Sequence, residues 1–300
     1  MTESMQLHGV PIVDTFAEAF PMTAARLIVT AVNAEWVQIA ATAATGYAAS
    51  VIGCDAEAGI EAILTPDETP DGRPGAALIF FAFSRDALQK AVSNRVAQCI
   101  LTCATTAVYN GLAGDAGKQI RIGGNLRYFG DGWQISKVIG DRRYWRMPAM
   151  DGEFVCEDLF GTVKGVAGGN LIILGETGPQ TLLAAQRTVE AIRTIPGVIL
   201  PFPGGIVRSG SKVGSKYASL RASTNEAYCP TLRGSVTSAL PEGVNAVYEI
   251  VIDGLTLKAV EDAMRAGMNA ACRCPGVRQI TAGNYGGKLG PYHVHLRTLV

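Results

Sequence analysis

A carboxylate inside an apolar stretch is the most informative chemical feature of this 300-residue sequence. Glu249 lies in N-A-V-Y-E-I-V-I-D-G (245–254), where β-branched and aromatic neighbours favour a strand. Because side chains alternate along a strand, Val247 and Val251 share its face, which favours burial over a solvent-exposed edge position. A buried carboxylate is costly unless it is hydrogen-bonded, paired or protonated through a raised pKa. We therefore predict a functional role for Glu249.

Two glycine-rich loops form the second chemical feature. Residues 196–217 read P-G-V-I-L-P-F-P-G-G-I-V-R-S-G-S-K-V-G-S-K-Y, and a similar order returns in 275–292, P-G-V-R-Q-I-T-A-G-N-Y-G-G-K-L-G-P-Y. Glycines let backbone N–H groups approach a ligand closely, and Lys212 and Lys216 supply charge for an anionic one. The repetition predicts two strand-then-loop units whose loops meet at a site.

Several other kinds of site are disfavoured. Neither loop has the strand–G-x-G-x-x-G–helix context or the lysine-Ser/Thr ending of a nucleotide phosphate site. His293 and His295 share one face of a predicted terminal strand, a spacing that can bind metal, but no third ligand is evident nearby, so no metal site is predicted. The seven cysteines are scattered and fit reduced, mostly buried thiols. No Ser-x-Gly elbow or Cys–His pair indicates a covalent nucleophile.

The composition is that of a globular protein, with 48% hydrophobic residues, 17% charged residues and a formal net charge of zero. Nothing in this balance favours nucleic acid or an anionic membrane as a partner. The low charge and the positive mean hydropathy of +0.20 predict apolar surface hidden in a subunit interface. No apolar run reaches the length of a bilayer span and no signal peptide is evident, so we expect a cytoplasmic protein.

The elements that must position these groups follow a strand–helix–strand rhythm. The clearest predictions are strands at 76–83, 170–174 and 247–252, and helices at 34–44, at 181–192 and after Gly254, with an apolar face from Val260 to Ala271. Repeated units of this size fit an α+β fold, a two-lobed, duplicated ferredoxin-like sandwich. We predict an N-terminal lobe at 1–146 and a C-terminal lobe at 147–300.

Four further segments carry local predictions. Asp14 or Thr15 is placed to cap a short helical turn that includes Glu18. A small-residue strand is expected at 48–53 and another strand near 126–129. The proline-rich segment 65–75 is predicted to be a rigid loop.

Nine segments together resemble one family, formylmethanofuran:tetrahydromethanopterin formyltransferase. They occur in the family's order over nearly the whole chain, which makes the set far more specific than any single motif. The segments are D-T-F-A-E-A-F (14–20), T-P-D-E-T-P-D-G-R-P-G (65–75), F-G-D-G (129–132), G-V-A-G-G-N (165–170), P-F-P-G-G-I-V (201–207), S-K-V-G-S-K (211–216), S-T-N-E-A-Y-C-P-T (223–231), V-Y-E-I-V-I-D-G (247–254) and A-G-N-Y-G-G-K-L-G (282–290).

The resemblance implies reversible transfer of a formyl group between formylmethanofuran and N5 of tetrahydromethanopterin. Methanofuran and tetrahydromethanopterin are then co-substrates, the attack is direct, and no covalent enzyme intermediate or bound cofactor is needed. The resemblance also implies a homotetramer of dimers with the active site in a cleft at a subunit interface. It assigns the catalytic role to the glutamate of the Y-E-I-V-I strand, which is Glu249 here.

The chain is similar to the version of the enzyme in methylotrophic bacteria, because it is neutral and richer in arginine than lysine, whereas the archaeal members are strongly acidic. That version is a subunit of a formyltransferase/hydrolase complex, uses a dephospho form of the pterin, and runs toward formylmethanofuran during formaldehyde oxidation. Residues 111–124 differ from the charged loop of the archaeal proteins, so contacts there are not carried over.

The predicted substrate-binding residues come mainly from the two glycine loops and the N-terminal segment. Lys212, Lys216, Lys288 and Arg208 suit the carboxylates of the methanofuran tail, or are ordinary surface cations. Aromatic rings such as Phe20 suit the furan or pterin rings, or belong to the core. The predicted set is Asp14, Thr15, Phe16, Phe202, Gly204, Gly205, Ser211, Lys212, Gly214, Ser215, Lys216, Asn225, Asn284, Tyr285 and Lys288.

Two other functions compete with this one. The first is a non-catalytic subunit that binds the pterin or assembles a one-carbon complex; the presence of Glu249 and of both glycine loops argues against it. The second is another acyl- or aminotransferase on a similar scaffold, which the missing Schiff-base and nucleophile signatures disfavour.

Overall fold

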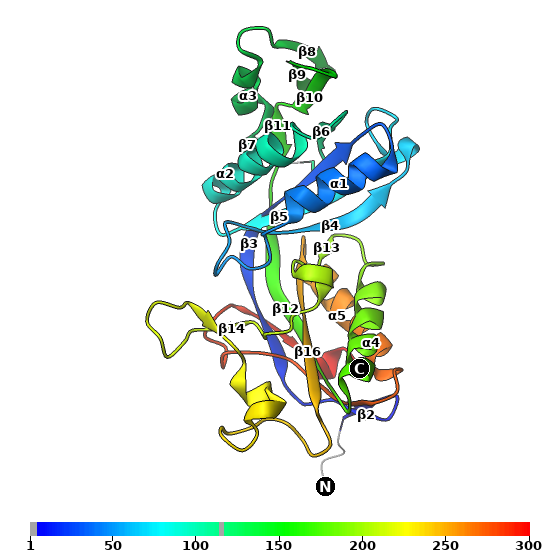
Figure 1. The fold of residues 1–300 in the computed structure, drawn as a ribbon, viewed down its shortest axis with the longest axis vertical. Helices are drawn as coiled ribbons and strands as arrows, with labels where there is room; N and C mark the ends of the chain where they lie inside the picture. Colours follow the sequence, from blue (N-terminus) through cyan, green and yellow to red (C-terminus); the bar gives the residue numbers. More distant parts are fainter. Residues whose placement is uncertain (1–4, 114–116) are drawn as a thin grey trace. The chain divides into compact units, whose positions relative to one another are not determined.

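The computed structural model describes residues 5–113 and 117–300 and shows an α+β protein with a mixed sheet (Figure 1). The chain forms two compact units. Unit 1 consists of 166–300 together with the described residues up to Pro21, and unit 2 consists of Met22–Gly165. Two long strands, β3 (Phe16–Thr30) and β12 (Val163–Gly175), each carry the chain from one unit into the other.

Unit 2 is built around four antiparallel strands and two helices. The sheet order is β6–β3–β5–β4, and the helices follow the first and third strands in the chain. Both helices begin where a side chain accepts a hydrogen bond from an exposed backbone N–H: Asn33 from Trp36 and Ser84 from Ala87. The elements are β3, α1 (Ala34–Thr45), β4 (Glu57–Leu64), β5 (Gly75–Ala82), α2 (Arg85–Arg95) and β6 (Ala107–Asn110).

The rest of unit 2 follows β6. Strand β10 pairs with β6 in parallel, and β8, β9 and β10 form an antiparallel meander, while β7 pairs with β11. The elements are β7 (Gln119–Arg121), α3 (Gly123–Leu126), β8 (Ile135–Ile139), β9 (Arg142–Ala149), β10 (Gly152–Glu157) and β11 (Leu159–Gly161).

Two strand predictions in unit 2 are wrong. Residues 126–129 are helical, because α3 continues into a 3-10 turn at Arg127–Gly130, closed by local backbone hydrogen bonds such as Leu126 N–H to Ile122 O. Residues 48–53 form turns in which Gly53 and Cys54 both donate to Ser50 O. In both places short-range hydrogen bonds outweigh the β-propensity of the sequence.

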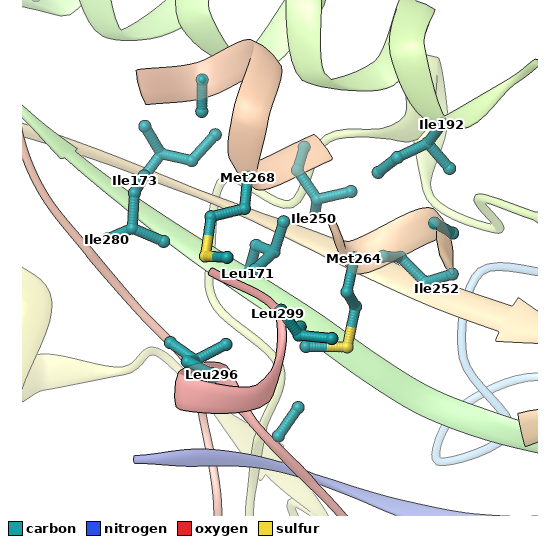
Figure 2. Packing of buried hydrophobic residues seen from close by; sticks show 14 of the residues in the cluster. Leu171, Ile173, Ile192, Ile250, Ile252, Met264, Met268, Ile280, Leu296 and Leu299 are labelled. Carbon is teal, nitrogen blue, oxygen red and sulfur yellow. The ribbon is translucent and has the colours of Figure 1, made fainter. Parts of the chain in front are cut away.

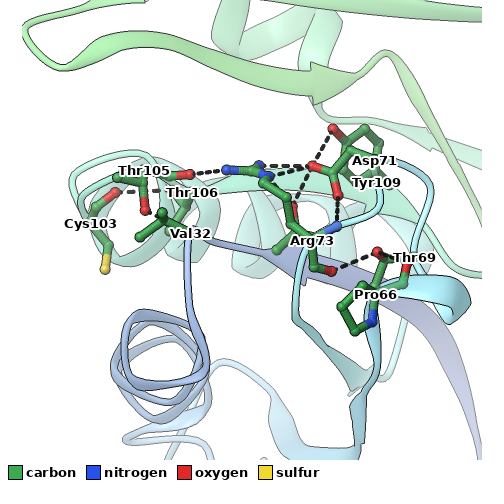
Figure 3. A network of polar contacts seen from close by, with 10 residues as sticks. Val32, Pro66, Thr69, Asp71, Arg73, Cys103, Thr105, Thr106 and Tyr109 are labelled. Carbon is green, nitrogen blue, oxygen red and sulfur yellow. Dashed lines mark hydrogen bonds and ion pairs between the residues drawn. The ribbon is translucent and has the colours of Figure 1, made fainter.

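The loop at 65–75 is held in place by a polar network (Figure 3). One carboxylate oxygen of Asp71 accepts hydrogen bonds from Thr30 Oγ1 at 2.8 Å, Arg73 Nε at 2.8 Å and Tyr109 Oη at 3.0 Å. Arg73 also donates to Thr105 O at 2.5 Å and to Thr30 Oγ1 at 2.9 Å. The loop is therefore tied to β3 and β6, and the only helix within it is a single 3-10 turn at Pro66–Glu68, as the rigid-loop prediction requires.

Unit 1 repeats the arrangement of unit 2. Its sheet order is β17–β12–β16–β13, again antiparallel between neighbours, with a helix after the first and third strands in the chain. The predicted strands and helices of this half are confirmed with wider bounds, most of all β12, which begins seven residues before the predicted strand. The elements are β12, α4 (Gly178–Ile192), β13 (Val198–Ile199), β16 (Ala246–Gly254), α5 (Leu257–Cys272) and β17 (Val277–Thr281).

Unit 1 also contains shorter strands, which extend its sheet or form separate hairpins. β18 pairs with the first residues of β3, β1 pairs with β2, and β14 pairs with β15. Their bounds are β1 (Gln6–Leu7), β2 (Val10–Pro11), β14 (Lys212–Val213), β15 (Ala222–Ser223) and β18 (Tyr292–His295). Across the described residues no helix is both long and apolar enough to span a bilayer.

The main core of unit 1 lies between the sheet and helices α4 and α5 (Figure 2). Leu171 and Ile173 of β12 and Ile250 of β16 contact this core, together with Met264 and Met268 of α5. Each fully buried side chain of this size stabilises the fold by about 1.5–3 kcal/mol relative to an exposed one. Because side chains alternate along a strand, the neighbouring residues of β12 and β16 face the opposite side of the sheet, where the candidate site lies.

Candidate active site

Glu249 lies near the middle of β16, on the face of the sheet opposite to α4 and α5. It is buried, with 4% of its surface exposed, as the alternation of Val247 and Val251 predicts. Its face also carries Ile172 and Leu174 of β12, which form a small second cluster with Val244. The loop after β13 continues along β16: Val207 N–H donates to Glu249 O at 2.7 Å, and Glu249 N–H donates to Val207 O at 3.1 Å. The first glycine loop therefore begins beside the buried carboxylate.

Ser211 holds the Glu249 carboxylate. Its backbone N–H donates to Oε2 at 2.7 Å, and its hydroxyl donates to Oε1 at 2.5 Å. Burial raises the pKa of Glu249, and the two bonds from Ser211 offset part of that rise. A carboxyl group with a raised pKa is suited to gain and lose a proton during a reaction near neutral pH.

A small cavity of about 30 Å³ opens beside Glu249. This is room for water but not for a substrate ring. Tyr228 lies on one side of the cavity, and burial raises the pKa of its phenol. The lining residues are Ile172, Val207, Arg208, Ser209, Gly210, Asn225, Tyr228, Cys229, Val247 and Glu249.

Gly210 permits the close approach that forms this cavity. Its φ is +75°, and a Cβ at this position would lie 2.6 Å from Cβ of Asn225. The approach brings Asn225 N–H within 3.1 Å of Ser209 O. Asn225, a predicted substrate-binding residue, therefore lines the same cavity as Glu249.

The two glycine loops meet, as the repeat predicts, and Tyr285 joins them. Its hydroxyl donates to Ser211 O at 2.8 Å and accepts a hydrogen bond from Val213 N–H at 2.8 Å. Burial raises the pKa of Tyr285, and the negative charges of Glu249 and Glu18 act in the same direction. Glu249, Ser211 and Tyr285 are thus linked by direct hydrogen bonds.

Glu18 fixes the second loop. It is 2% exposed, and its carboxylate accepts hydrogen bonds from the backbone N–H groups of Tyr285 at 2.7 Å, Gly287 at 3.0 Å, Gly290 at 2.9 Å and Leu289. Burial alone raises the pKa of Glu18, but the four donors outweigh it and lower the pKa. The backbone N–H groups of the second glycine loop therefore already bind an anion, the carboxylate of Glu18.

The predicted short helical turn capped by Asp14 or Thr15 is wrong, because β3 begins at Phe16 and pairs there with β18. The predicted residues of this segment lie close to the second loop. Asn284 Nδ2 donates to Thr15 Oγ1 at 2.9 Å and to Phe16 O at 3.2 Å. Asp14 instead forms an exposed ion pair with Arg297. Thr15 and Phe16 thus join the site's framework, whereas Asp14 lies at the surface.

The two terminal histidines pack against Phe16. Its ring centroid lies 4.7 Å from that of His293 and 5.3 Å from that of His295. Among the described residues there is no group of three or more His, Cys, Asp or Glu side chains arranged to hold a metal ion. The shared face of His293 and His295 therefore serves aromatic packing in this structure.

Other predicted residues lie apart from Glu249. Phe202, Gly204 and Gly205 form a turn, closed by Gly205 N–H to Phe202 O at 2.7 Å, that does not contribute to the cavity lining. Lys212 forms an ion pair with Glu226 at 2.5 Å.

The remaining predicted residues lie on the two loops. Gly214 and Ser215 belong to the hairpin around β14 and β15, where Gly214 N–H donates to Arg221 O and Ser215 Oγ accepts from Tyr217 N–H. Lys216 and Lys288 are exposed.

Sequence reasoning missed several contributors, among them Glu18, Tyr228 and Ser209. Glu18 shares a strand face with Phe16 and Phe20 in F-A-E-A-F, and these apolar residues indicate a buried strand carboxylate in the same way as Val247 and Val251 do for Glu249. Tyr228 and Ser209 carry no such signal, because they reach the cavity from irregular segments that only the fold brings to β16.

Comparison with known proteins gives consistent matches over the whole chain. A family model described as formylmethanofuran-tetrahydromethanopterin formyltransferase matches residues 5–149, and one described as FTR, proximal lobe, matches residues 152–299. The formylmethanofuran–tetrahydromethanopterin formyltransferase of Methylococcus capsulatus is 56% identical over 99% of this chain and 100% of that protein. The enzyme of the same name from Methanosarcina mazei is 50% identical over 98% of this chain and 100% of that protein.

A solved structure matches the fold. The formyltransferase/hydrolase complex (FhcABCD) of Methylorubrum extorquens, in complex with methylofuran, contains a chain that is 53% identical and superposes with a TM-score of 0.95 over 98% of both chains. The chain therefore belongs to the formylmethanofuran–tetrahydromethanopterin formyltransferase family.

Proposed function

We propose that Glu249 is the proton-transfer group of the formyl transfer that this enzyme catalyses between formylmethanofuran and tetrahydromethanopterin. The reaction is that of the family to which the chain belongs. The observation that supports this role is the burial of Glu249 on β16, which raises its pKa. Two hydrogen bonds from Ser211 hold its carboxylate in place. A group with a pKa moved toward neutrality is an efficient acid and base in turn.

The proposed chemistry balances without a covalent enzyme intermediate. The N5 lone pair of tetrahydromethanopterin forms a bond to the formyl carbon, and the carbonyl electrons move to oxygen. The bond from that carbon to the methanofuran nitrogen then breaks as the carbonyl re-forms. N5 loses one proton and the methanofuran nitrogen gains one. Ionised Glu249 accepts the first proton and, once protonated, donates the second.

The developing oxyanion needs hydrogen-bond donors. In the second glycine loop, the N–H groups of Tyr285, Gly287, Leu289 and Gly290 donate to Glu18. We therefore assign oxyanion stabilisation to donors at the cavity beside Glu249, where Gly210 and Asn225 lie. Exclusion of water from a buried site also protects the formyl group from hydrolysis.

Substrate binding is proposed for the fifteen residues predicted from the sequence and for Arg208, with two groups in distinct roles. Lys212, Lys216, Lys288 and Arg208 are exposed or half-buried cations that suit the carboxylates of the methanofuran tail. Phe16 and Tyr285 are half-buried aromatic residues beside the second loop that suit the ring systems.

We also propose that each unit has a ferredoxin-like fold, which is supported by the β-α-β-β-α-β order of six elements in both units. A division of the sequence into lobes at 146/147 is proposed from the family models, which meet between residues 149 and 152. The compact units divide the chain at other positions, because β3 and β12 pass from one unit to the other at 21/22 and 165/166. A homotetramer is proposed from the low charged fraction and from exposed apolar side chains such as Trp133 and Phe129. Sedimentation velocity tests it, and a monomer at all concentrations would contradict it.

The similarity to proteins of Methylococcus capsulatus and Methylorubrum extorquens supports a methylotroph type of enzyme. We propose for it a cytoplasmic location, membership of a formyltransferase/hydrolase complex, a dephospho pterin, and net flux toward formylmethanofuran during formaldehyde oxidation. Methanofuran and the pterin are then the only co-substrates. The ratio of the rates with the two pterin forms, measured in both directions on the purified chain, tests the substrate preference.

The role of Glu249 is tested by formyl transfer in the purified chain, with wild type beside Glu249→Gln. We expect the variant to remain folded and to lose about 10²- to 10⁴-fold in turnover, the usual contribution of a positioned acid or base. Glu242→Gln removes an exposed carboxylate just before β16 and is the matched control, with turnover unchanged. Normal turnover in Glu249→Gln would contradict the proposed role. Inactive but folded wild type would favour a subunit that works only within its complex.

A further inference from the structure

We propose that Glu18 and Tyr285 are positioning residues for formyl transfer, which act on Glu249 through Ser211. The inference rests on the proposed role of Glu249. It differs from substrate binding by Tyr285, because the part of Tyr285 that matters here is its hydroxyl rather than its ring. All four residues belong to unit 1, so the chain of contacts lies within one compact unit.

The first step runs from Glu18 to the second loop. Four backbone N–H groups of 285–290 converge on the two oxygens of one buried carboxylate. Hydrogen bonds to an ionised acceptor are stronger than neutral ones, so this carboxylate helps to fix the path of the loop. Among these four donors Tyr285 comes first in the sequence, and its backbone N lies 2.7 Å from Oε2 of Glu18.

The second step runs from Tyr285 to the first loop. Its phenol hydroxyl donates to Ser211 O and accepts from Val213 N–H, each at 2.8 Å. These bonds hold the backbone on both sides of Lys212, at the start of a hairpin with few buried side chains. The hydroxyl therefore sets where the N–H and hydroxyl of Ser211 point.

The third step runs from Ser211 to Glu249. The N–H of Ser211 reaches Oε2 and its hydroxyl reaches Oε1, so both carboxylate oxygens are oriented by one residue. These bonds favour the ionised form of Glu249 against the effect of burial. A loosened Ser211 would misplace the carboxylate and raise its pKa further.

The test uses Tyr285→Phe, which keeps the ring and deletes the hydroxyl. We expect kcat to fall by about tenfold or more while KM for both substrates stays within about twofold, because misplacing a catalytic group by a fraction of an ångström costs rate rather than binding. The acid limb of the kcat/KM profile should move to higher pH. Tyr217→Phe deletes an exposed hydroxyl on the same hairpin and is the control, with kinetics and pH profile unchanged.

A double-mutant cycle adds a second readout. Glu18→Gln replaces one acceptor oxygen by an NH2 group, which cannot accept hydrogen bonds from the loop N–H groups, so it should shift the profile in the same direction as Tyr285→Phe. Because both residues act through Ser211, their effects should not add. The kcat of the double variant should therefore lie within about twofold of that of the slower single variant. If Glu18→Gln fails to fold, Tyr285→Phe alone still decides.

The outcomes separate the two proposals. If Glu249→Gln is inactive but Tyr285→Phe keeps the wild-type pH profile, the positioning role is overturned and the role of Glu249 stays intact. Multiplicative losses in the double variant, or a rise in KM with unchanged kcat, would likewise overturn it. A fully active Glu249→Gln would overturn the role of Glu249 and the positioning inference with it.

Discussion

Ser211 donates two hydrogen bonds to the carboxylate of Glu249, one from its backbone N–H at 2.7 Å and one from its hydroxyl at 2.5 Å. The pair joins a loop residue to a strand residue 38 positions away in the sequence. Burial raises the pKa of Glu249, and these two bonds lower it. The balance between burial and Ser211 therefore sets the pH at which Glu249 is ionised.

The first prediction concerns Ser211→Ala, which removes the hydroxyl bond and keeps the N–H bond. The pKa of Glu249 should then rise further above its ordinary value. Because ionised Glu249 is the proton acceptor, activity is lost as pH falls through that pKa, so the acid limb of kcat/KM should move to higher pH. Ser219→Ala, at an exposed position of the same hairpin, should leave the profile unchanged. An unshifted limb in Ser211→Ala would show that Ser211 does not tune Glu249.

The second prediction concerns Lys212, whose side chain pairs with Glu226 at 2.5 Å. The two side chains are 33% and 43% exposed, so solvent weakens the pair and a substrate carboxylate can displace Glu226. Lys212→Met should raise KM for formylmethanofuran about tenfold, equivalent to about 1.4 kcal/mol, while Glu226→Gln should lower it. The measurement is KM at several salt concentrations. Equal KM in wild type and both variants would mean that Lys212 has only a surface role.

The third prediction concerns close packing of α5 on β12. A Cβ on Gly169 would lie 2.3 Å from Val260 Cγ1, and Val260 is fully buried. Gly169→Ala should therefore lower the free energy of unfolding by about 1–3 kcal/mol. Gly178→Ala, at the first residue of α4 with nothing within 4 Å of its Cβ, should be neutral or stabilise by about 0.5–1 kcal/mol. Urea unfolding measures both, and equal midpoints would contradict the packing argument.

The fourth prediction concerns the polar network of unit 2. Arg73→Met removes the donors to Asp71, Thr30 and Thr105 (Figure 3). It leaves a half-buried carboxylate with fewer partners, and should lower the free energy of unfolding by about 2 kcal/mol. Arg187→Met breaks an exposed pair with Glu190 and should change the free energy of unfolding much less than Arg73→Met does. Similar losses in both variants would show that the network adds nothing beyond a surface ion pair.

Local patterns account for the parts of the fold and site that were predicted correctly. The alternation around Glu249 and the helical spacing from Val260 to Ala271 reflect burial on one face, which a sequence records residue by residue. The same alternation around Glu18 is as clear, but the predicted helical turn at Asp14 obscured it. The strands expected at 48–53 and 126–129 failed because turns and a short helix satisfied the backbone locally there.

The repeated Pro-Gly-Val segments mark corresponding positions in unit 1. Each follows a helix and leads into a strand, β13 after α4 and β17 after α5. The sequence therefore records the two β-α-β halves of one unit. The order of strands within the sheet, and its recurrence in unit 2, required the strand pairings, because hydrogen bonds between distant strands leave no spacing signal.

The sequence by itself determined the family, the buried carboxylate at 249 and the two glycine loops, because each depends on residue types at close spacing. Only the tertiary structure decided that the carboxylate of Glu18 accepts hydrogen bonds from the second glycine loop, and that Tyr285 connects this loop to Ser211. The partners of the Glu18 hydrogen bonds lie 267 to 272 positions apart in the sequence, and those of the Tyr285–Ser211 bond lie 74 positions apart. Each of these bonds uses a backbone N–H or C=O group, which does not depend on the residue type. Residue identity does not specify which backbone groups meet, so the fold alone fixes them.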